Sequence, residues 1–331
     1  MSYGDRGRGP QLPPLPKPYE FVPLPDGRIP LESPAGHHRY QAERYSGTLT
    51  GQIIARSPVH VASGLLEQSG DRKYPMVKAH FRTQGRLAIP ATSLKGCIRS
   101  IAEAISRSSV QVTRAREIER PAEVREKDRR EVTARLDICQ RIFGALGYQG
   151  MVCFADALLP ADLPAVIIPS PQLFRPRPES TDTYFEGRRP YGRKFYMHGT
   201  LAKGDMPLEA CPIASVFALH MAFENLSAGE LGLVLTALGQ SEQAVQPRFY
   251  PKLGGGKPAC LGTIEVANLS LTGFTGAIAY ADFDPVPQPL DLATLLAAAR
   301  TERLVLNEQL GRLAEVLRWP REDRECPDRN Y

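Results

Sequence analysis

The segment that decides the fold reads Ile89-Pro90-Ala91-Thr92-Ser93-Leu94-Lys95-Gly96-Cys97-Ile98-Arg99. Apolar residues continue at helical spacing as far as Ile105, so we predict a helix over 93–105, with Thr92 or Ser93 as its N-cap. Unpaired N–H groups at a helix start, beside a lysine in the first turn, suit a bound phosphate group. A capped helix with surface cations and no ligand would show the same pattern.

Strand-like and helix-like segments alternate on both sides of this helix. We predict strands at 46–54, 151–154, 212–223 and 262–271, and we expect the strand at 212–223 to be buried. One further helix ends at Phe143, and another spans 228–238, with Ser227 and Glu230 as a capping box. This order predicts an α+β fold, an RRM-like or ferredoxin-like sandwich with insertions.

The chain divides into three predicted parts: a Pro-rich N-terminal arm (1–45), the main domain (46–289), and a C-terminal helical segment and tail (290–331). The prolines favour an extended arm over packed structure. Alternating Arg and Glu over 107–135 predict a solvated insertion, either a charged helix or disorder. For the C-terminal segment we predict one helix or a helix pair on its own domain, with docking on a neighbouring subunit as the alternative.

Composition sets broad limits on function. The chain has 331 residues, 42% of them hydrophobic, which is sufficient for a globular core, and its net charge of +5 permits an acidic partner without requiring one. It lacks both a run of roughly 20 apolar residues and the apolar core of a signal peptide, so we expect a cytoplasmic protein. The six cysteines have no zinc-ligand spacing, and we expect mostly buried free thiols and no metal site.

A second candidate segment is rich in glycine and reads Pro251-Lys252-Leu253-Gly254-Gly255-Gly256-Lys257-Pro258-Ala259-Cys260-Leu261-Gly262. Consecutive glycines let a backbone approach a sugar-phosphate chain closely, and the flanking lysines supply charge. It is not a Walker A loop, because Pro258 follows Lys257. A flexible hairpin turn would have the same composition.

A third candidate segment reads Gly192-Arg193-Lys194-Phe195-Tyr196-Met197-His198. Cations and aromatic rings in this order suit single-stranded RNA, because cations meet phosphates while rings stack on bases. A strand with an aromatic core face is the alternative. His198 could act as a general base, but a single histidine without an evident partner is more often structural.

Four segments, taken in order, resemble motifs of the RAMP superfamily of CRISPR-associated proteins. They are 89–99 (I-P-x-S-S-L-K-G-x-x-R in the family), 143–156 (F-G-x-x-x-x-x-G-x-V-x-F-x-D), 225–231 (N-L-x-x-x-E-L) and the glycine-rich loop at 253–262. Residues 192–198 also resemble a segment of backbone-type members from type III systems. The resemblance extends over residues 46–285.

This resemblance implies a backbone subunit that holds the CRISPR guide RNA (crRNA) in a type III effector complex, a ribonucleoprotein of antiviral defence. Its implied partners are the guide, complementary target RNA, other RAMP subunits and the large polymerase-like subunit. Guide binding would need no cofactor. The implied RNA contacts are Ser93, Lys95, Gly96, Arg99, Arg193, Lys194, Tyr196, His198, Lys252, Gly254, Gly255, Gly256 and Lys257.

In the catalytic branch of the family, an aspartate two residues before a proline promotes cleavage of target RNA that depends on Mg²⁺ or another divalent metal. Matching on Pro75 places Lys73 at that position, and Asp71 is the nearest acid, so Asp71 is the candidate catalytic residue. Cys260 also departs from the family, which more often has glycine there. Whether the chain cleaves RNA is therefore left open by the sequence.

Two rival functions are compatible with the same sequence. A stand-alone RAMP endoribonuclease that processes CRISPR precursor RNA would use a histidine near the first strand and helix, with His37, His38 and His60 as candidates. A protein-interaction subunit without RNA contact would leave the lysines and glycines incidental. No second Ser-Leu-Lys-Gly motif or glycine-rich loop is present, so we predict a single RAMP domain.

Overall fold

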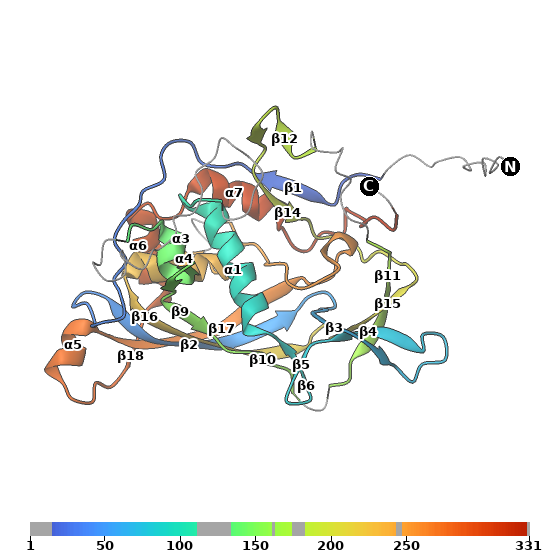
Figure 1. Ribbon diagram of the computed structural model, residues 1–331, viewed down its shortest axis with the longest axis horizontal. Helices are drawn as coiled ribbons and strands as arrows, with labels where there is room; N and C mark the ends of the chain where they lie inside the picture. Colours follow the sequence, from blue (N-terminus) through green and yellow to red (C-terminus); the bar gives the residue numbers. More distant parts are fainter. Residues whose placement is uncertain (1–14, 111–133, 161–162, 174–182, 243–246, 330–331) are drawn as a thin grey trace.

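A five-stranded antiparallel sheet forms the centre of the molecule (Figure 1). The computed structural model describes residues 15–110, 134–160, 163–173, 183–242 and 247–329. The strands lie in the order β18 (Gln288–Pro289), β17 (Ile264–Thr275), β2 (Tyr45–Ala55), β16 (Val216–Leu226) and β9 (Val152–Phe154). The long strands β2, β16 and β17 thus lie side by side at its middle.

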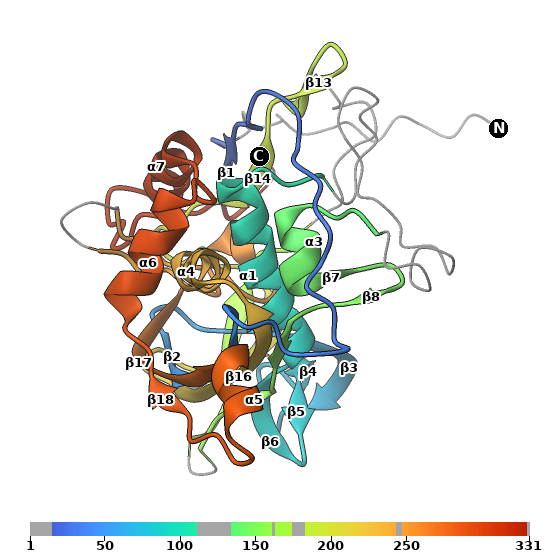
Figure 2. The same ribbon diagram turned by 90° about the vertical axis from the view of Figure 1, so that its left-hand side faces the viewer.

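Five helices cover one face of this sheet (Figures 1 and 2): α1 (Ala91–Ile105), α3 (Ile138–Phe143), α4 (Ala228–Ala237), α6 (Leu292–Thr301) and α7 (Asn307–Val316). The core lies between these two layers. In β16 every second residue from Phe217 to Phe223 is buried and those between are exposed, which is the pattern of a sheet covered on one face. The prediction that 212–223 is buried throughout is wrong for this reason.

The chain order β2, α1, β9, β16, α4, β17 confirms the predicted α+β class and the sequence of strand, helix and strand. The capping box of α4 is also confirmed: Glu230 N donates to Ser227 Oγ (3.1 Å) and Ser227 N to Glu230 Oε2 (3.0 Å). Helix α1 begins at Ala91, two residues before the predicted start, and its N-cap residue is Pro90, which makes no side-chain capping hydrogen bond. The prediction of Thr92 or Ser93 as its N-cap is therefore wrong.

The C-terminal segment is a helix pair that packs on its own domain. A Cβ added at Gly232 of α4 would lie 2.0 Å from the Leu295 carbonyl oxygen of α6, so the two helices cross at close range. Leu310 and Leu313 of α7 belong to the main core. This confirms packing on the chain's own domain as the position of the segment.

Part of the predicted N-terminal arm is packed. Strand β1 (Tyr19–Val22) pairs antiparallel with β14 (Arg193–Tyr196), and Val22 is fully buried. The prediction of an arm without packed structure is wrong for these residues, because β1 pairs with β14 and the ring of Tyr19 packs against that of Tyr196. Residues 1–14 of the arm and 111–133 of the charged insertion lie outside the described residues.

Shorter strands build the rest of the fold. A second sheet has the order β11 (Val166–Ser170), β15 (Met206–Ala210), β4 (Met76–His80) and β3 (Ala62–Gln68). The remaining elements are β5 (Arg82–Thr83), β6 (Arg86–Ile89), β7 (Gly144–Ala145), β8 (Tyr148–Gln149), β10 (Ala157–Leu158), β12 (Phe185–Glu186), β13 (Arg189–Pro190), α5 (Gly276–Ala281) and the 3-10 turn η2 (Lys257–Ala259).

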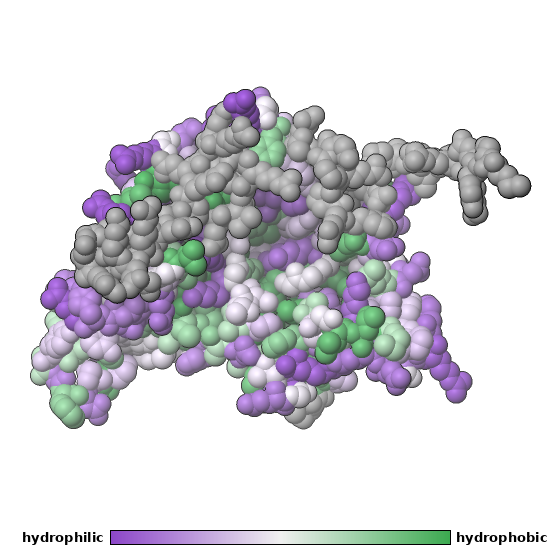
Figure 3. All heavy atoms as spheres, in the orientation of Figure 1, coloured by the Kyte–Doolittle hydropathy of each residue, from purple (hydrophilic) through white to green (hydrophobic). Residues whose placement is uncertain are grey.

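Exposed apolar residues gather at two places on the surface. One is the region of α5 and the loop to β18, with Tyr280, Phe283 and Val286, and the other is the β3–β4 hairpin, with Leu65 and Leu66 (Figure 3). None of the described helices is long and apolar enough to cross a membrane.

The cysteines differ from the expectation of buried free thiols at three positions, Cys153, Cys260 and Cys326. Cys260 and Cys326 form a disulfide, because the fold brings together residues 66 positions apart. Cys139 and Cys211 are buried free thiols as predicted, whereas Cys153 is exposed.

Candidate nucleic-acid interface

A cleft of about 520 Å³ brings together the three segments that the sequence singles out. Helix α1 forms one wall, the glycine-rich loop a second, and strand β14 a third. Its lining residues are Thr92, Ser93, Gly96, Cys97, Ser100 and Ile101 from α1; Lys252, Gly254, Gly255 and Lys257 from the loop; Lys194, Phe195 and Tyr196 from β14; and Val61, Ala62 and Leu317. Segments about 60 to 160 residues apart in the sequence thus share one concave surface.

The glycine-rich loop has its shape for reasons internal to the protein. Gly254 and Gly256 have φ angles of +83° and +67°, in the left-handed region that favours glycine. A Cβ at Gly254 would lie 2.3 Å from the His60 carbonyl oxygen, and Gly255 N donates a hydrogen bond of 2.8 Å to that same oxygen. The fold therefore requires Gly254 and Gly256, and the loop is held against the start of the domain.

Gly96 has no such internal explanation. It lies in the middle of α1 and lines the cleft, and a Cβ added there would meet no described atom within 4 Å. Glycine in a helix interior costs about 1 kcal/mol relative to alanine, so an unexplained one is unfavourable for the fold alone. Its effect is to leave the α1 wall of the cleft open to close approach by another molecule.

Asp156 provides the cap that α1 lacks in its own sequence. Its Oδ1 accepts a hydrogen bond from Ala91 N (2.7 Å) and its Oδ2 accepts one from Thr83 Oγ1 (2.7 Å). These hydrogen bonds hold the pKa of the Asp156 carboxyl below its usual value. At Ala91 the place predicted for a phosphate is therefore taken by a carboxylate. The last residue of the 143–156 motif was the available signal for this cap.

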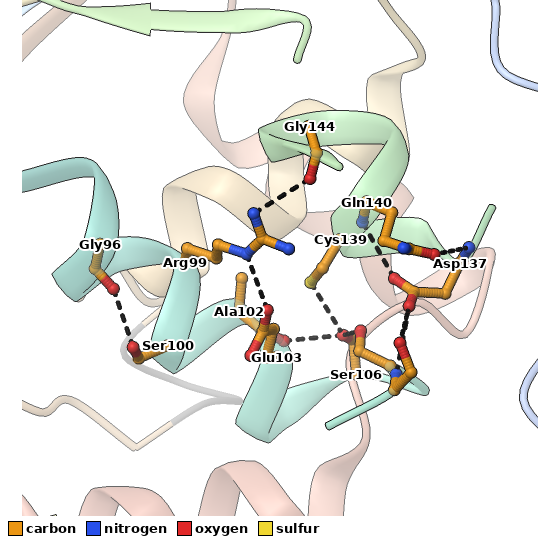
Figure 4. Close-up of polar contacts among 12 residues, drawn as sticks. Gly96, Arg99, Ser100, Ala102, Glu103, Ser106, Asp137, Cys139, Gln140 and Gly144 are labelled. Carbon is orange, nitrogen blue, oxygen red and sulfur yellow. Dashed lines mark hydrogen bonds and ion pairs between the residues drawn. The ribbon is translucent and has the colours of Figure 1, made fainter. Parts of the chain in front are cut away.

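Two predicted RNA contacts, Arg99 and Arg193, are engaged inside the protein. Arg99 Nε donates to Glu103 Oε1 (2.8 Å) and its Nη1 donates to the Gly144 carbonyl (3.0 Å), as Figure 4 shows. Arg193 Nη1 donates to the other carboxylate oxygen of Glu103 (2.9 Å), and Glu103 is only 7% exposed. A buried carboxylate thus neutralises both arginines, and neither lines the cleft. Their contact with RNA stays a prediction, which these internal partners do not favour.

Lys95 lies on the same side of α1 as Arg99 and Glu103, because these residues follow it by four and eight positions, close to one and two helical turns. It is half-buried, and burial lowers the pKa of its ammonium group. Lys95 is not among the cleft-lining residues, whereas Ser93 and Gly96 are. The structure therefore separates Lys95 from the lysines of the glycine-rich loop.

Lys252, which lines the cleft, and His198, which does not, are both buried. Lys252 Nζ donates to the Met197 carbonyl (2.5 Å), and burial, aided by Arg324 and Lys257, holds its pKa well below 10.5. His198 is fully buried, accepts from Thr263 Oγ1 at Nδ1 (2.9 Å) and donates from Nε2 to the Tyr250 carbonyl (3.0 Å). Burial lowers the pKa of His198 to about 3. His198 is thus buried and neutral, and its contact with RNA stays a prediction that this position does not favour. The Met197 carbonyl occupies the amine of Lys252.

Lys194 and Lys257 remain as cations of the cleft. Lys194 Nζ lies 4.5 Å from the ring centre of Tyr19, 5.1 Å from that of Tyr184 and 4.8 Å from that of Tyr196. Such contacts attract an ammonium group to the ring faces and fix its position. Lys257, at the start of η2, forms no ion pair with a described carboxylate.

Asp71 lies in the β3–β4 hairpin and does not line the cleft. It is exposed, and its Oδ1 accepts hydrogen bonds from Lys73 N (2.7 Å) and Tyr74 N (3.1 Å), so it closes the turn. In the described ranges no three His, Cys, Asp or Glu side chains gather as a metal site would require.

The histidines of the rival endoribonuclease do not form a shared site with the cleft. His60 is buried beneath the glycine-rich loop, donates from Nδ1 to the Glu209 carbonyl (2.6 Å), and has its pKa lowered by burial. His37 and His38 are exposed, and His37 Nε2 contacts the Gln149 carbonyl (3.0 Å).

Comparisons with known proteins identify the family. The RAMP superfamily model matches residues 52–265, well over half of the chain, and no curated protein matches. Among solved structures, a chain from the cryo-EM structure of the type III-B Cmr-beta bound to cognate target RNA is 14% identical, with a TM-score of 0.37. The match covers 69% of the present chain and 61% of that one, a likeness too weak to carry a functional argument. On the match to the family model, the protein belongs to the RAMP superfamily.

Proposed function

We propose that this protein is a crRNA-binding backbone subunit of a type III CRISPR RNA-guided effector complex, acting in antiviral defence in the cytoplasm. Family membership supports a CRISPR role, and one observation carries the RNA-binding part: three predicted RNA-binding segments line a single cleft. The β-α-β-β-α-β order of the central sheet fits an RRM-like, ferredoxin-like RAMP domain over 46–289.

In this role the cleft holds the sugar-phosphate backbone of the guide. Lys194 and Lys257 face phosphates, the Ser93 hydroxyl donates a hydrogen bond, and Gly96 permits close approach. Gly254 and Gly255 present loop backbone to the cleft, which Tyr196 also lines. Such contacts carry no sequence information, so base pairing with target RNA would select the sequence.

The partners proposed with this role are crRNA, complementary target RNA, other RAMP subunits and the large polymerase-like subunit. Mg²⁺-dependent cleavage of target RNA is a separate proposal that depends on Asp71. Replacing Asp71 by alanine decides it: loss of cleavage with retained guide binding assigns catalysis, and unchanged cleavage removes Asp71 from it.

The test of guide binding is to purify the protein with its nucleic acid and sequence the bound RNA. We expect repeat-spacer RNA with the wild type and its loss in the Lys194→Ala/Lys257→Ala double variant. The matched control is Lys78→Ala/Lys203→Ala, which removes two exposed lysines outside the cleft and should retain RNA. If the wild type binds no RNA even at low salt, where phosphate contacts are strongest, the RNA-binding role fails and an interaction subunit replaces it.

A further inference from the structure

The C-terminal tail is covalently bonded to the glycine-rich loop. Cys260 directly follows η2 and forms the disulfide with Cys326 of the tail. Lys257, the first residue of η2, lines the cleft, whereas tail residues 321–328 do not. One bond therefore joins a wall of the cleft to a segment that plays no part in lining it.

On the loop side, the bond holds an unfavourable backbone conformation. Cys260 has a φ angle of +70°, in the left-handed region that residues with a Cβ rarely adopt. Glycine occupies the neighbouring positive-φ positions at Gly254, Gly256 and Gly262. Cys260 alone in this loop has a side chain at such a position, and its sulfur is the atom that reaches the tail.

On the tail side, the noncovalent attachments are backbone and arginine hydrogen bonds. Cys326 N donates to the Thr200 carbonyl (3.1 Å), Thr200 N to the Arg324 carbonyl (2.7 Å), and Arg324 Nη1 to the His198 carbonyl (3.2 Å). The apolar contacts of the two cysteines form a small cluster with Ala202 and Ala259, separate from the main core. The tail thus depends on the disulfide more than a core segment would.

Electrostatic repulsion acts against the attached tail. Arg324 lies near the buried Lys252, and Lys257 is a second positive neighbour of that amine. Neither Lys252 nor Arg324 forms a salt bridge with a carboxylate in the described part of the chain, although Glu20 and Asp323 lie near enough to Arg324 to favour its charge. Burial and these two positive neighbours therefore disfavour the charged form of the Lys252 amine while the tail is attached, and detachment of the tail would relieve this cost.

We propose that Cys260 and Cys326 form a redox-controlled strap: the closed disulfide holds the glycine-rich loop in its cleft-lining conformation, and two free thiols let the tail detach and weaken RNA binding. The effect on RNA rests on the proposed function, whereas the attachment of the tail does not. The strap makes the cleft sensitive to oxidising conditions, because these convert the two thiols of the reduced intracellular protein into the disulfide.

The chemistry is thiol–disulfide exchange with a dithiol. A thiolate of the dithiol attacks the sulfur of Cys326, the less buried of the two residues, which breaks the Cys260–Cys326 bond and releases Cys260 as a thiolate that takes up a proton. The second thiolate of the dithiol then displaces Cys326. The dithiol is oxidised to a disulfide, and the two cysteines gain two electrons and two protons. Closure is the reverse reaction, with a low-molecular-weight disulfide as the oxidant.

The test compares full-length protein treated with glutathione disulfide and with dithiothreitol. A Cys153→Ser background removes the exposed free thiol, so that disulfides between molecules do not contribute. Limited trypsin digestion with mass spectrometry measures cleavage after Arg321 and Arg324, and alkylation counts the free thiols at Cys260 and Cys326. Fluorescence anisotropy with single-stranded RNA measures binding.

We expect reduction to speed cleavage of the tail and to weaken RNA binding several-fold. A further Cys326→Ser change should reproduce the reduced protein and abolish its response to dithiothreitol. Alkylation of both cysteines after oxidation, or equal cleavage in the two states, overturns the strap. Faster cleavage with unchanged RNA affinity overturns the control of the cleft but leaves RNA binding in place. If RNA binds in neither state while cleavage still responds, it is the proposed function that fails, and with it the effect on RNA.

Discussion

Gly96 offers a perturbation that separates folding from RNA binding. Gly96→Ala adds one methyl group to the cleft-facing side of α1, where it meets no described protein atom within 4 Å. Alanine has the higher helix propensity and a less flexible unfolded chain, so the free energy of unfolding should rise by roughly 0.5–1 kcal/mol. For a chain of this size that corresponds to an increase of about 2 °C in Tm.

RNA binding should change in the opposite direction. The same methyl group occupies space that a closely approaching sugar-phosphate backbone would use, so we expect the affinity to fall. Gly96→Leu should reduce it further, by about tenfold or more, equivalent to about 1.4 kcal/mol. The assays are differential scanning calorimetry for Tm and anisotropy of labelled RNA for Kd.

Gly311→Ala is the matched control. Gly311 also lies within a helix, α7, and a Cβ there also meets no described atom within 4 Å, but it does not line the cleft. It should raise Tm by a similar amount and leave RNA affinity unchanged. If both Gly96 variants bind RNA as tightly as the wild type does, the α1 wall of the cleft does not contact RNA and this reasoning is refuted.

Three further predictions follow from the same structure. Glu103→Gln should lower the free energy of unfolding in urea by about 3 kcal/mol, because two half-buried arginines lose their shared, buried counter-charge, and an unchanged urea midpoint would contradict this. Asp156→Ala should cost about 1 kcal/mol near neutral pH through loss of the α1 cap. The pKa of Asp156 is depressed in the folded protein, so its carboxylate stabilises the protein above the unfolded pKa of about 3.9, and this effect is lost as pH falls through the folded pKa. The free energies of unfolding of wild type and variant should therefore converge in acid. A difference that stays constant with pH would count against the cap. Lys257→Ala should reduce the slope of log Kd against log salt concentration by about 0.7 with single-stranded RNA, and an unaltered slope would mean that Lys257 makes no phosphate contact.

Local signals in the sequence predicted the elements of the fold. The apolar spacing over 93–105 and the Ser227–Glu230 capping box each lie within a single helix, so neighbouring residues contain the information. The order of strands and helices followed from these elements. The same reasoning found the three segments that line the cleft, although it could not show that they meet.

The errors concern partners that are distant in the sequence. Arg193 pairs with Glu103 across 90 positions, and Ala91 is capped by Asp156 across 65. Neither Lys252 nor His198 carries a local sign of burial, because packing around each comes from the tail and from other strands. A charged residue in a promising motif is therefore assigned to a ligand too readily when its protein partner lies elsewhere in the chain.

Cross-linking tests the central claim, that the cleft between α1, β14 and the glycine-rich loop holds RNA, most directly. The purified protein with its bound RNA would be irradiated with ultraviolet light, and cross-linked peptides would be identified by mass spectrometry. The account predicts RNA adducts in peptides that contain residues 91–101, 193–196 and 252–257, all reduced in the Lys194→Ala/Lys257→Ala variant. Adducts confined to other peptides, and unaffected in that variant, would contradict it.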